Sequence, residues 1–143
     1  MEELQLKAMM TMLRASQHIG EFSRQQVKTY GLNITEFAVL ELLFHKGDQP
    51  IQMIGKKILI ASSSITYVVD KLEKKGYVKR THCPSDRRVI YASLTDEGRA
   101  FIESIFPQHA AAMTQLFDGL DEAQLQQLID ISKQVGKTAE ASY

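Results

Sequence analysis

Two groups of side chains in the middle of the chain have types and spacing suited to binding rather than to covalent chemistry. Ser62, Ser63 and Ser64 stand together where a helix should begin, and small hydroxyl groups there let the backbone approach phosphates and base edges. Arg87 and Arg88 follow a stretch of turn formers, and paired guanidinium groups at a hairpin tip suit a narrow groove of a duplex. Together the two groups predict a helix that contacts DNA, followed by a β-wing.

The other reactive side chains lack the spacing of a catalytic or metal-binding site. The four histidines, at positions 18, 45, 82 and 109, are scattered, and Cys83 is the only cysteine. The sequence has no phosphate-binding glycine loop, no nucleophile elbow and no cluster of carboxylates or histidines suited to acid–base work. We therefore expect no enzyme activity, no metal, no cofactor and no internal disulfide.

The charges are distributed unevenly, although 17 basic and 17 acidic residues give zero net charge. Residues 50–100 contain ten lysines and arginines against five acids, so this central part carries a surplus of five positive charges between acidic flanks. A local basic surface favours binding to nucleic acid. The alternative is a solvated face of alternating charges that binds nothing.

The length and hydropathy of the chain are typical of one folded domain. It has 143 residues, and no apolar run approaches the roughly 18 to 20 residues that a membrane helix needs. The first residues, Met1 to Gln5, are acidic where a signal peptide would be basic. We expect a cytoplasmic protein with no membrane partner.

The elements that must position the serines and arginines are mainly helices, since only three prolines interrupt the chain. Apolar residues at helical spacing predict a first helix over 4–29. Asn33 and Glu36 have the spacing of a capping box that starts a second helix. Pro50 suits the first turn of a short third helix.

The serines and arginines then fall on a fourth helix and on the hairpin that follows it. Ser62 is a candidate N-cap of this helix, and Gly76 is its expected left-handed C-terminal residue. Residues 77–81 and 89–94 alternate with the period of strands and should pair, with the arginines near the tip. The predicted fold is mainly α with a small β-wing, a winged helix-turn-helix head.

Two more helices complete the predicted chain. Thr95 can cap a fifth helix, which Pro107 should bend or interrupt and Gly119 should end. Asp121 opens a last helix, and residues 137–143 should fray.

The terminal helices carry more apolar surface than a head of about 65 residues can cover, which predicts a homodimer. We expect a single domain over 1–143, in which 32–99 is the winged-helix part and 1–30 and 100–140 are dimerisation helices.

Three sequence blocks, in the same order and spacing, make the chain resemble the MarR family of transcriptional regulators. They are Leu72-Glu73-Lys74-Lys75-Gly76-Tyr77-Val78, Asp86-Arg87-Arg88 and Leu94-Thr95-Asp96-Glu97-Gly98. The segments 35–43, 45–50 and 64–71 are similar to the quinone- and aromatic-responsive MhqR type within that family. The resemblance implies a dimeric repressor of stress or detoxification genes, released from a palindromic operator by a small aromatic or quinone-like effector.

The resemblance and the residue types together give a predicted DNA-binding surface. Its members are Ser62, Ser63, Ser64, Thr66, Tyr67, Lys71, Asp86, Arg87 and Arg88. Arg88 matches the wing arginine of the family, Asp86 can orient its guanidinium, and Lys71 is placed on phosphate. The alternatives are simple helix capping for the serines and a solvated turn for the arginines.

A second predicted site would take the aromatic effector where the first, second and fifth helices meet the head. Its candidate residues are Met9, Met10, Arg14, His18, Phe37 and Phe44. Methionine and phenylalanine offer polarizable walls, and Arg14 or His18 can meet a phenolate or carboxylate. The alternative is that these side chains form core.

Cys83 is a candidate redox residue. The peroxide-sensing branch of the family uses a cysteine in the first helix, which is absent here, so that mechanism does not carry over. Charge on Lys79, Arg80 and His82 would favour the Cys83 thiolate and its alkylation by a quinone beside the wing. The alternative is an inert, half-exposed thiol.

A different class of function remains open, because the winged-helix fold does not fix what it binds. The chain could be a protein-interaction module without an operator of its own. Such a module would not need two arginines at the wing.

Overall fold

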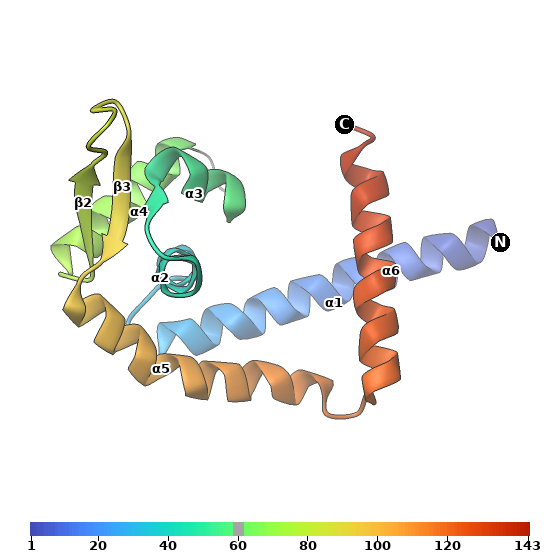
Figure 1. The fold of residues 1–143 in the computed structure, drawn as a ribbon. Coiled ribbons are helices and arrows are strands. Elements are labelled where there is room, and N and C mark those ends of the chain that lie inside the picture. The colour runs from blue at the N-terminus through green and yellow to red at the C-terminus, as the bar shows by residue number, and fades with distance from the viewer. Residues whose placement is uncertain (59–61) are drawn as a thin grey trace. The chain divides into compact units, whose positions relative to one another are not determined.

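The computed structural model describes residues 1–58 and 62–143, and the side chains of Ser62 and Ser63 also lie outside the description. Figure 1 shows helices throughout the chain and a small sheet whose long hairpin projects from the head. The chain divides into two compact units, Met1–His109 and Ala110–Tyr143. The predicted single domain and the bounds of its parts stay predictions.

The first two helices are α1 (Glu2–Lys28) and α2 (Ile34–Lys46). The predicted capping box of α2 is confirmed, because the Glu36 amide donates to Asn33 Oδ1 at 2.8 Å and the Asn33 amide donates to Glu36 Oε1 at 3.1 Å. These bonds satisfy amides that have no partner inside the helix. On α1, Val27 is buried.

The head continues with β1 (Gln49–Pro50), α3 (Ile51–Lys57) and α4 (Ser62–Lys74). Pro50 precedes α3 as its N-cap and pairs in the sheet, so its predicted place inside the first turn is wrong by one residue. The capping role predicted for Ser62 depends on a side chain outside the description, although α4 does begin at this residue. The core of the head gathers apolar side chains from its helices and sheet: Leu40, Leu43, Ile54, Ile65, Val69, Leu72, Val78 and Ile102.

The sheet has three antiparallel strands in the order β1-β3-β2, with β2 at Val78–His82 and β3 at Ile90–Leu94. The predicted hairpin is confirmed, with Val78 opposite Leu94 and Thr81 opposite Tyr91. The pairing of β1 with β3 was not predicted. Two residues are too few to show the alternation by which a strand is recognised.

The chain ends with α5 (Asp96–Thr114), a 3-10 turn (Gln115–Phe117) and α6 (Glu122–Glu140). Thr95 caps α5 as predicted, since its Oγ1 accepts from the Gly98 amide at 2.9 Å. Asp121 opens α6 as predicted, and it does so through a capping box with Gln124 that was not predicted. Among the described residues, no helix combines the length and apolar character needed to cross a bilayer.

Two predictions about these helices are wrong, one of them in part. A bend or an interruption was predicted at Pro107, and the interruption does not occur, because α5 runs through this residue with buried Ile105 and His109 on either side of it. Packing of this kind can offset the hydrogen bond that a proline removes. The end of α6 is not frayed from residue 137 but helical to Glu140. Thr138 Oγ1 donates to the Gln134 carbonyl at 3.0 Å within that last part.

The start of α5 packs unusually closely against the start of the wing. A Cβ added at Gly98 would lie 2.0 Å from the Tyr77 carbonyl oxygen, which also accepts from the Thr95 amide at 3.0 Å. The rings of Tyr77 and Phe101 stack with their centroids 4.4 Å apart. Glycine at position 98 therefore fixes how the wing leaves α4 and enters α5.

Candidate nucleic-acid interface

The helix α4 presents one face to the core and the other to solvent. Ile65, Val68 and Leu72 are buried, whereas Ser64, Thr66 and Tyr67 are exposed. Lys71 Nζ lies 5.2 Å from the centroid of the Tyr67 ring, close enough for a cation–π contact. The predicted set on this helix thus lies on its open face, except for Ser62 and Ser63, whose side chains are outside the described residues.

At the tip of the wing, Asp86 holds Arg88 in a two-point ion pair. Arg88 Nε donates to Asp86 Oδ1 at 3.1 Å and Nη2 donates to Oδ2 at 3.2 Å. The Arg88 side chain is still 90% exposed, and Arg87 beside it is exposed too. The bonds from the Arg88 side chain and backbone keep the pKa of Asp86 below its ordinary value. The guanidinium is therefore oriented by its partner and open to solvent.

A second arginine, Arg80, joins the wing to α4. From β2 its Nη1 donates to Glu73 Oε1 at 2.9 Å and its Nη2 pairs with Asp70 Oδ1. The sequence analysis missed this pairing. The one available signal was the placement of two acids three residues apart on the outer face of a helix otherwise rich in cations.

A buried ion pair joins the start of α2 to the residue that follows α4. Lys75 Nζ lies 2.7 Å from Glu36 Oε2 and donates to the Gly31 carbonyl at 3.2 Å. The Glu36 side chain is only 4% exposed, so the carboxylate that closes the capping box also receives the ammonium group. This pair was likewise missed by the sequence analysis.

Cys83 is half-buried beside the wing, and its Sγ lies 3.2 Å from Ser85 Oγ. The pKa of this thiol is lowered first by the Ser85 side-chain hydrogen bond and then by backbone hydrogen bonds, while desolvation and then the Asp86 charge oppose the shift. Lys79, Arg80 and His82, whose charge was expected to favour the thiolate, are not among the causes of this shift, and the redox role of Cys83 stays a prediction. Arg80 is engaged by Asp70 and Glu73 instead.

The predicted effector residues lie in separate parts of unit Met1–His109. Met9, Met10, Arg14 and His18 are exposed on α1. Phe37 is buried, with its ring centroid 4.3 Å from that of His109, while Phe44 packs beside Phe106 at 6.2 Å. These distances show that the two phenylalanines make packing contacts within the single chain, which is what the alternative reading of them as core residues predicts. The effector site itself stays a prediction.

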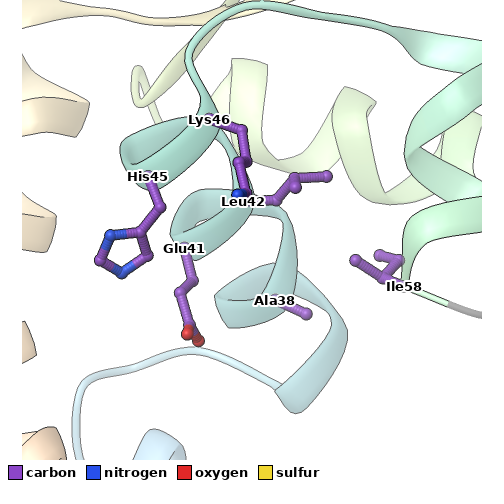
Figure 2. A pocket seen from close by; sticks show the side chains of 6 residues that line it. All are labelled: Ala38, Glu41, Leu42, His45, Lys46 and Ile58. Carbon is purple, nitrogen blue, oxygen red and sulfur yellow. The ribbon is translucent and has the colours of Figure 1, made fainter.

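A shallow hollow of about 310 Å³ lies along α2. Figure 2 shows Ala38 and Leu42 pointing toward Ile58 of the neighbouring segment, with Glu41 and His45 on the other side of the helix. None of the six predicted effector residues is among those that line this hollow in the described chain.

His109 is a buried polar side chain that the sequence analysis did not single out. In the described part of the structure its Nδ1 has no hydrogen-bond partner. Burial lowers the pKa of this imidazole, with the nearby Glu41 carboxylate opposing the shift. Across the described residues, no group of three or more His, Cys, Asp or Glu side chains is placed to hold a metal ion.

Comparison with known proteins agrees with this arrangement of helix and wing. A family model described as "MarR family" matches residues 32–90. The chain is 47% identical over 139 residues to the HTH-type transcriptional regulator MhqR of Bacillus subtilis, covering 97% of this chain and 96% of that protein. The chain belongs to the MarR family. It is therefore a DNA-binding transcriptional regulator of winged-helix fold that is similar to the MhqR type, as the sequence predicted.

Two solved MarR-type structures show what relatives of this fold bind. Sco3205 of Streptomyces coelicolor, solved in complex with DNA, has a TM-score of 0.87 and 28% identity, covering 97% of this chain and 92% of its own. CouR of Rhodococcus jostii RHA1, bound to p-coumaroyl-CoA, has a TM-score of 0.78 and 25% identity, covering 87% and 88%. One relative thus holds DNA and another holds an aromatic acyl ligand.

Proposed function

We propose that this MarR-family chain is a homodimeric repressor that binds a palindromic operator through α4 and the wing. The observation that carries the proposal is the exposed Arg88, oriented by Asp86 beside a helix whose open face bears Thr66, Tyr67 and Lys71. An arginine held in this way can enter a minor groove while α4 lies in the adjacent major groove.

The side chains of α4 proposed to meet DNA bear hydroxyl groups and, on Lys71, a flexible ammonium group. None has the planar fork that reads guanine in two bonds, so we expect modest direct readout of bases and a larger contribution from DNA shape. Lys71 and Arg87 would contact phosphates. Ser62 and Ser63 stay in the proposed surface on sequence grounds.

The apolar residues left exposed on α1 and α6 support the proposed dimer. On α1 they are Leu4, Leu6, Met9, Met10, Met12, Leu13 and Ile19, and on α6 they are Leu128, Ile129, Ile131 and Val135. A second copy covering these helices would remove them from water, at about 25 cal/mol for each Å² buried. Two-fold symmetry would then set two wings and two α4 helices about 10 bp apart on the duplex.

The effector we propose is a small aromatic or quinone-like molecule, bound near Met9, Met10, Arg14, His18, Phe37 and Phe44 once a partner covers α1. Similarity to the MhqR type supports this class of ligand, as does the aromatic ligand of CouR. Binding that favours a different spacing of the two heads would release DNA.

The proposed function is tested by selecting bound duplexes from a random pool and titrating the best one. We expect Arg88→Ala to weaken binding by at least about 1 kcal/mol, the scale of one charged contact. Arg24→Ala, which removes an exposed arginine from α1, serves as the matched control and should bind as the unaltered protein does. Equal affinity of the Arg88 variant at fixed salt would remove the wing from the proposal.

Four further measurements separate the finer parts of the proposal. Steep loss of binding with rising salt supports contact with phosphates, whereas a module that binds only protein would retain no duplex at all. Addition of quinones and hydroquinones to the complex tests release, and a reporter driven by the selected operator tests repression. Sedimentation at micromolar concentration tests the dimer.

A further inference from the structure

The helix α4 carries two acidic side chains on the surface through which this family is proposed to meet DNA. Asp70 and Glu73 are both exposed, and Thr66, Asp70 and Glu73 are spaced four and three residues apart, which places them in one row along the helix. Lys71 and Lys74 flank this row. Two carboxylates beside a phosphate backbone would repel it. Something in the structure must therefore offset the negative charge of Asp70 and Glu73 if this surface binds DNA.

The row of acids faces β2 of the wing. Thr66 and Arg80 line the same hollow, of about 300 Å³, between α3, α4 and the sheet. From that strand Arg80 pairs with Asp70 through Nη2 and with Glu73 through Nη1 at 2.9 Å. Its side chain is only 24% exposed, whereas Arg88 at the wing tip is 90% exposed. One guanidinium therefore engages both carboxylates, and it is much less exposed than that of Arg88.

We propose that Arg80 is a positioning residue for DNA binding, which draws the Asp70 and Glu73 carboxylates toward the sheet and offsets their repulsion of the duplex. The proposal rests on the proposed DNA-binding role of α4. It differs from a direct phosphate contact, because both terminal nitrogens of Arg80 already donate to carboxylates. It also ties the angle of α4 to the wing, since the two acids lie on the helix and the arginine on the strand.

A rescue experiment distinguishes charge compensation from a direct contact with DNA. The variants are Arg80→Met, Asp70→Asn with Glu73→Gln, and all three changes together, each titrated against the duplex selected by the unaltered protein. We expect Arg80→Met to weaken binding about tenfold or more, since two carboxylates then face the phosphates unpaired. In the triple variant, which has no acid to compensate, affinity should return to within about threefold of the unaltered protein.

The salt dependence gives an independent readout. Loss of a phosphate contact lowers the slope of log affinity against log salt by about 0.9. Loss of a compensating cation leaves the number of phosphate contacts unchanged, so we expect Arg80→Met to keep the slope of the unaltered protein. Lys79→Met, which removes a cation from the other face of the same strand, is the matched control for loss of one positive charge from the wing.

Three results would overturn the role of Arg80. They are a triple variant as weak as Arg80→Met, a slope lowered by about 0.9 in Arg80→Met, or binding more than about tenfold weaker when only the acids are neutralised. The last comparison does not require Arg80→Met to fold. If the unaltered protein retains no duplex, the proposed function fails instead, so the two failures are distinguishable.

Discussion

Replacing Lys75 by methionine should destabilise the head through a carboxylate that has no other cation close to it in the described contacts. Glu36 is 4% exposed, and its Oε2 lies 2.7 Å from Lys75 Nζ. Its other oxygen accepts from the Asn33 amide at 3.1 Å. Methionine has nearly the length of lysine, so Lys75→Met removes the charge and the bond to the Gly31 carbonyl while filling similar space.

The expected loss in the free energy of unfolding follows from how far Glu36 and Lys75 are buried. Breaking a fully buried pair by removing one member costs about 3 to 5 kcal/mol, most of it from the charge left behind. The Lys75 side chain is 35% exposed, so water can reach the vacated place and solvate part of that charge. We therefore expect a loss of about 2 kcal/mol in the free energy of unfolding. Glu36→Gln should rescue about half of it in the double variant, because glutamine also closes a capping box.

The assay is urea denaturation at one fixed protein concentration, because the stability of a dimer depends on concentration. Arg24→Met is the control. It breaks the ion pair with Glu21, whose side chain and that of Arg24 are more than half exposed, and should lower the free energy of unfolding far less than Lys75→Met does. Additive losses in the Glu36→Gln and Lys75→Met double variant would refute the account of an unpaired buried carboxylate.

Three further outcomes follow from the close packing, burial and hydrogen bonds described above. Gly98→Ala should lower the free energy of unfolding by at least about 2 kcal/mol, since the new Cβ meets the Tyr77 carbonyl at 2.0 Å. The lowered pKa of His109 means that the folded protein binds fewer protons than the unfolded chain, so unfolding measured by circular dichroism should become easier as pH falls below about 6.5. Ser85→Ala should raise the apparent pKa of Cys83, measured from the pH dependence of its alkylation by iodoacetamide.

Each of these outcomes has its own control. Gly119→Ala, where a Cβ would meet nothing within 4 Å, should change stability by no more than about 0.5 kcal/mol. His109→Gln should flatten the dependence of stability on pH between about 7.5 and 5.5. An unaltered slope would show that another group titrates. Cys83→Ser should not be alkylated, and an identical alkylation profile in Ser85→Ala would exclude the hydroxyl as the cause.

The sequence predicted well those features that depend on neighbours along the chain. The capping box at Asn33, the helix start at Asp121, the cap at Thr95 and the left-handed Gly76, with φ of 82°, are all settled within a few residues of backbone. The hairpin was predicted for the same reason, since its strands are joined by a short turn. Pro107 was mispredicted because packing of the surrounding turns, which the sequence does not display, decides whether the helix continues.

The ionic contacts of the candidate interface also divide into those set by neighbours along the chain and those set by tertiary packing. The pairing of Asp86 with Arg88 spans two residues and could be predicted from their spacing. Lys75 lies 39 residues from Glu36, and in such a case each acid has many possible basic partners. Only the placement of α2 against α4 and of α4 against β2 selects among them. The contacts of Glu36 with Lys75 and of Arg80 with Asp70 and Glu73 could not be predicted, because they depend on position in space rather than on residue type.

These contacts explain how a chain of zero net charge can present a cationic surface to a duplex. Three acids on or near α4 are matched to a cation from another segment: Glu36 to Lys75, and Asp70 and Glu73 to Arg80. Arg88 is matched only to Asp86 in its own turn and remains exposed. Pairing offsets these three negative charges and leaves the Arg88 guanidinium exposed at the wing tip, so the local field depends on the fold as well as on composition. High salt should accordingly weaken DNA binding long before it loosens the buried pair at Glu36, because ions screen exposed charges more strongly than buried ones.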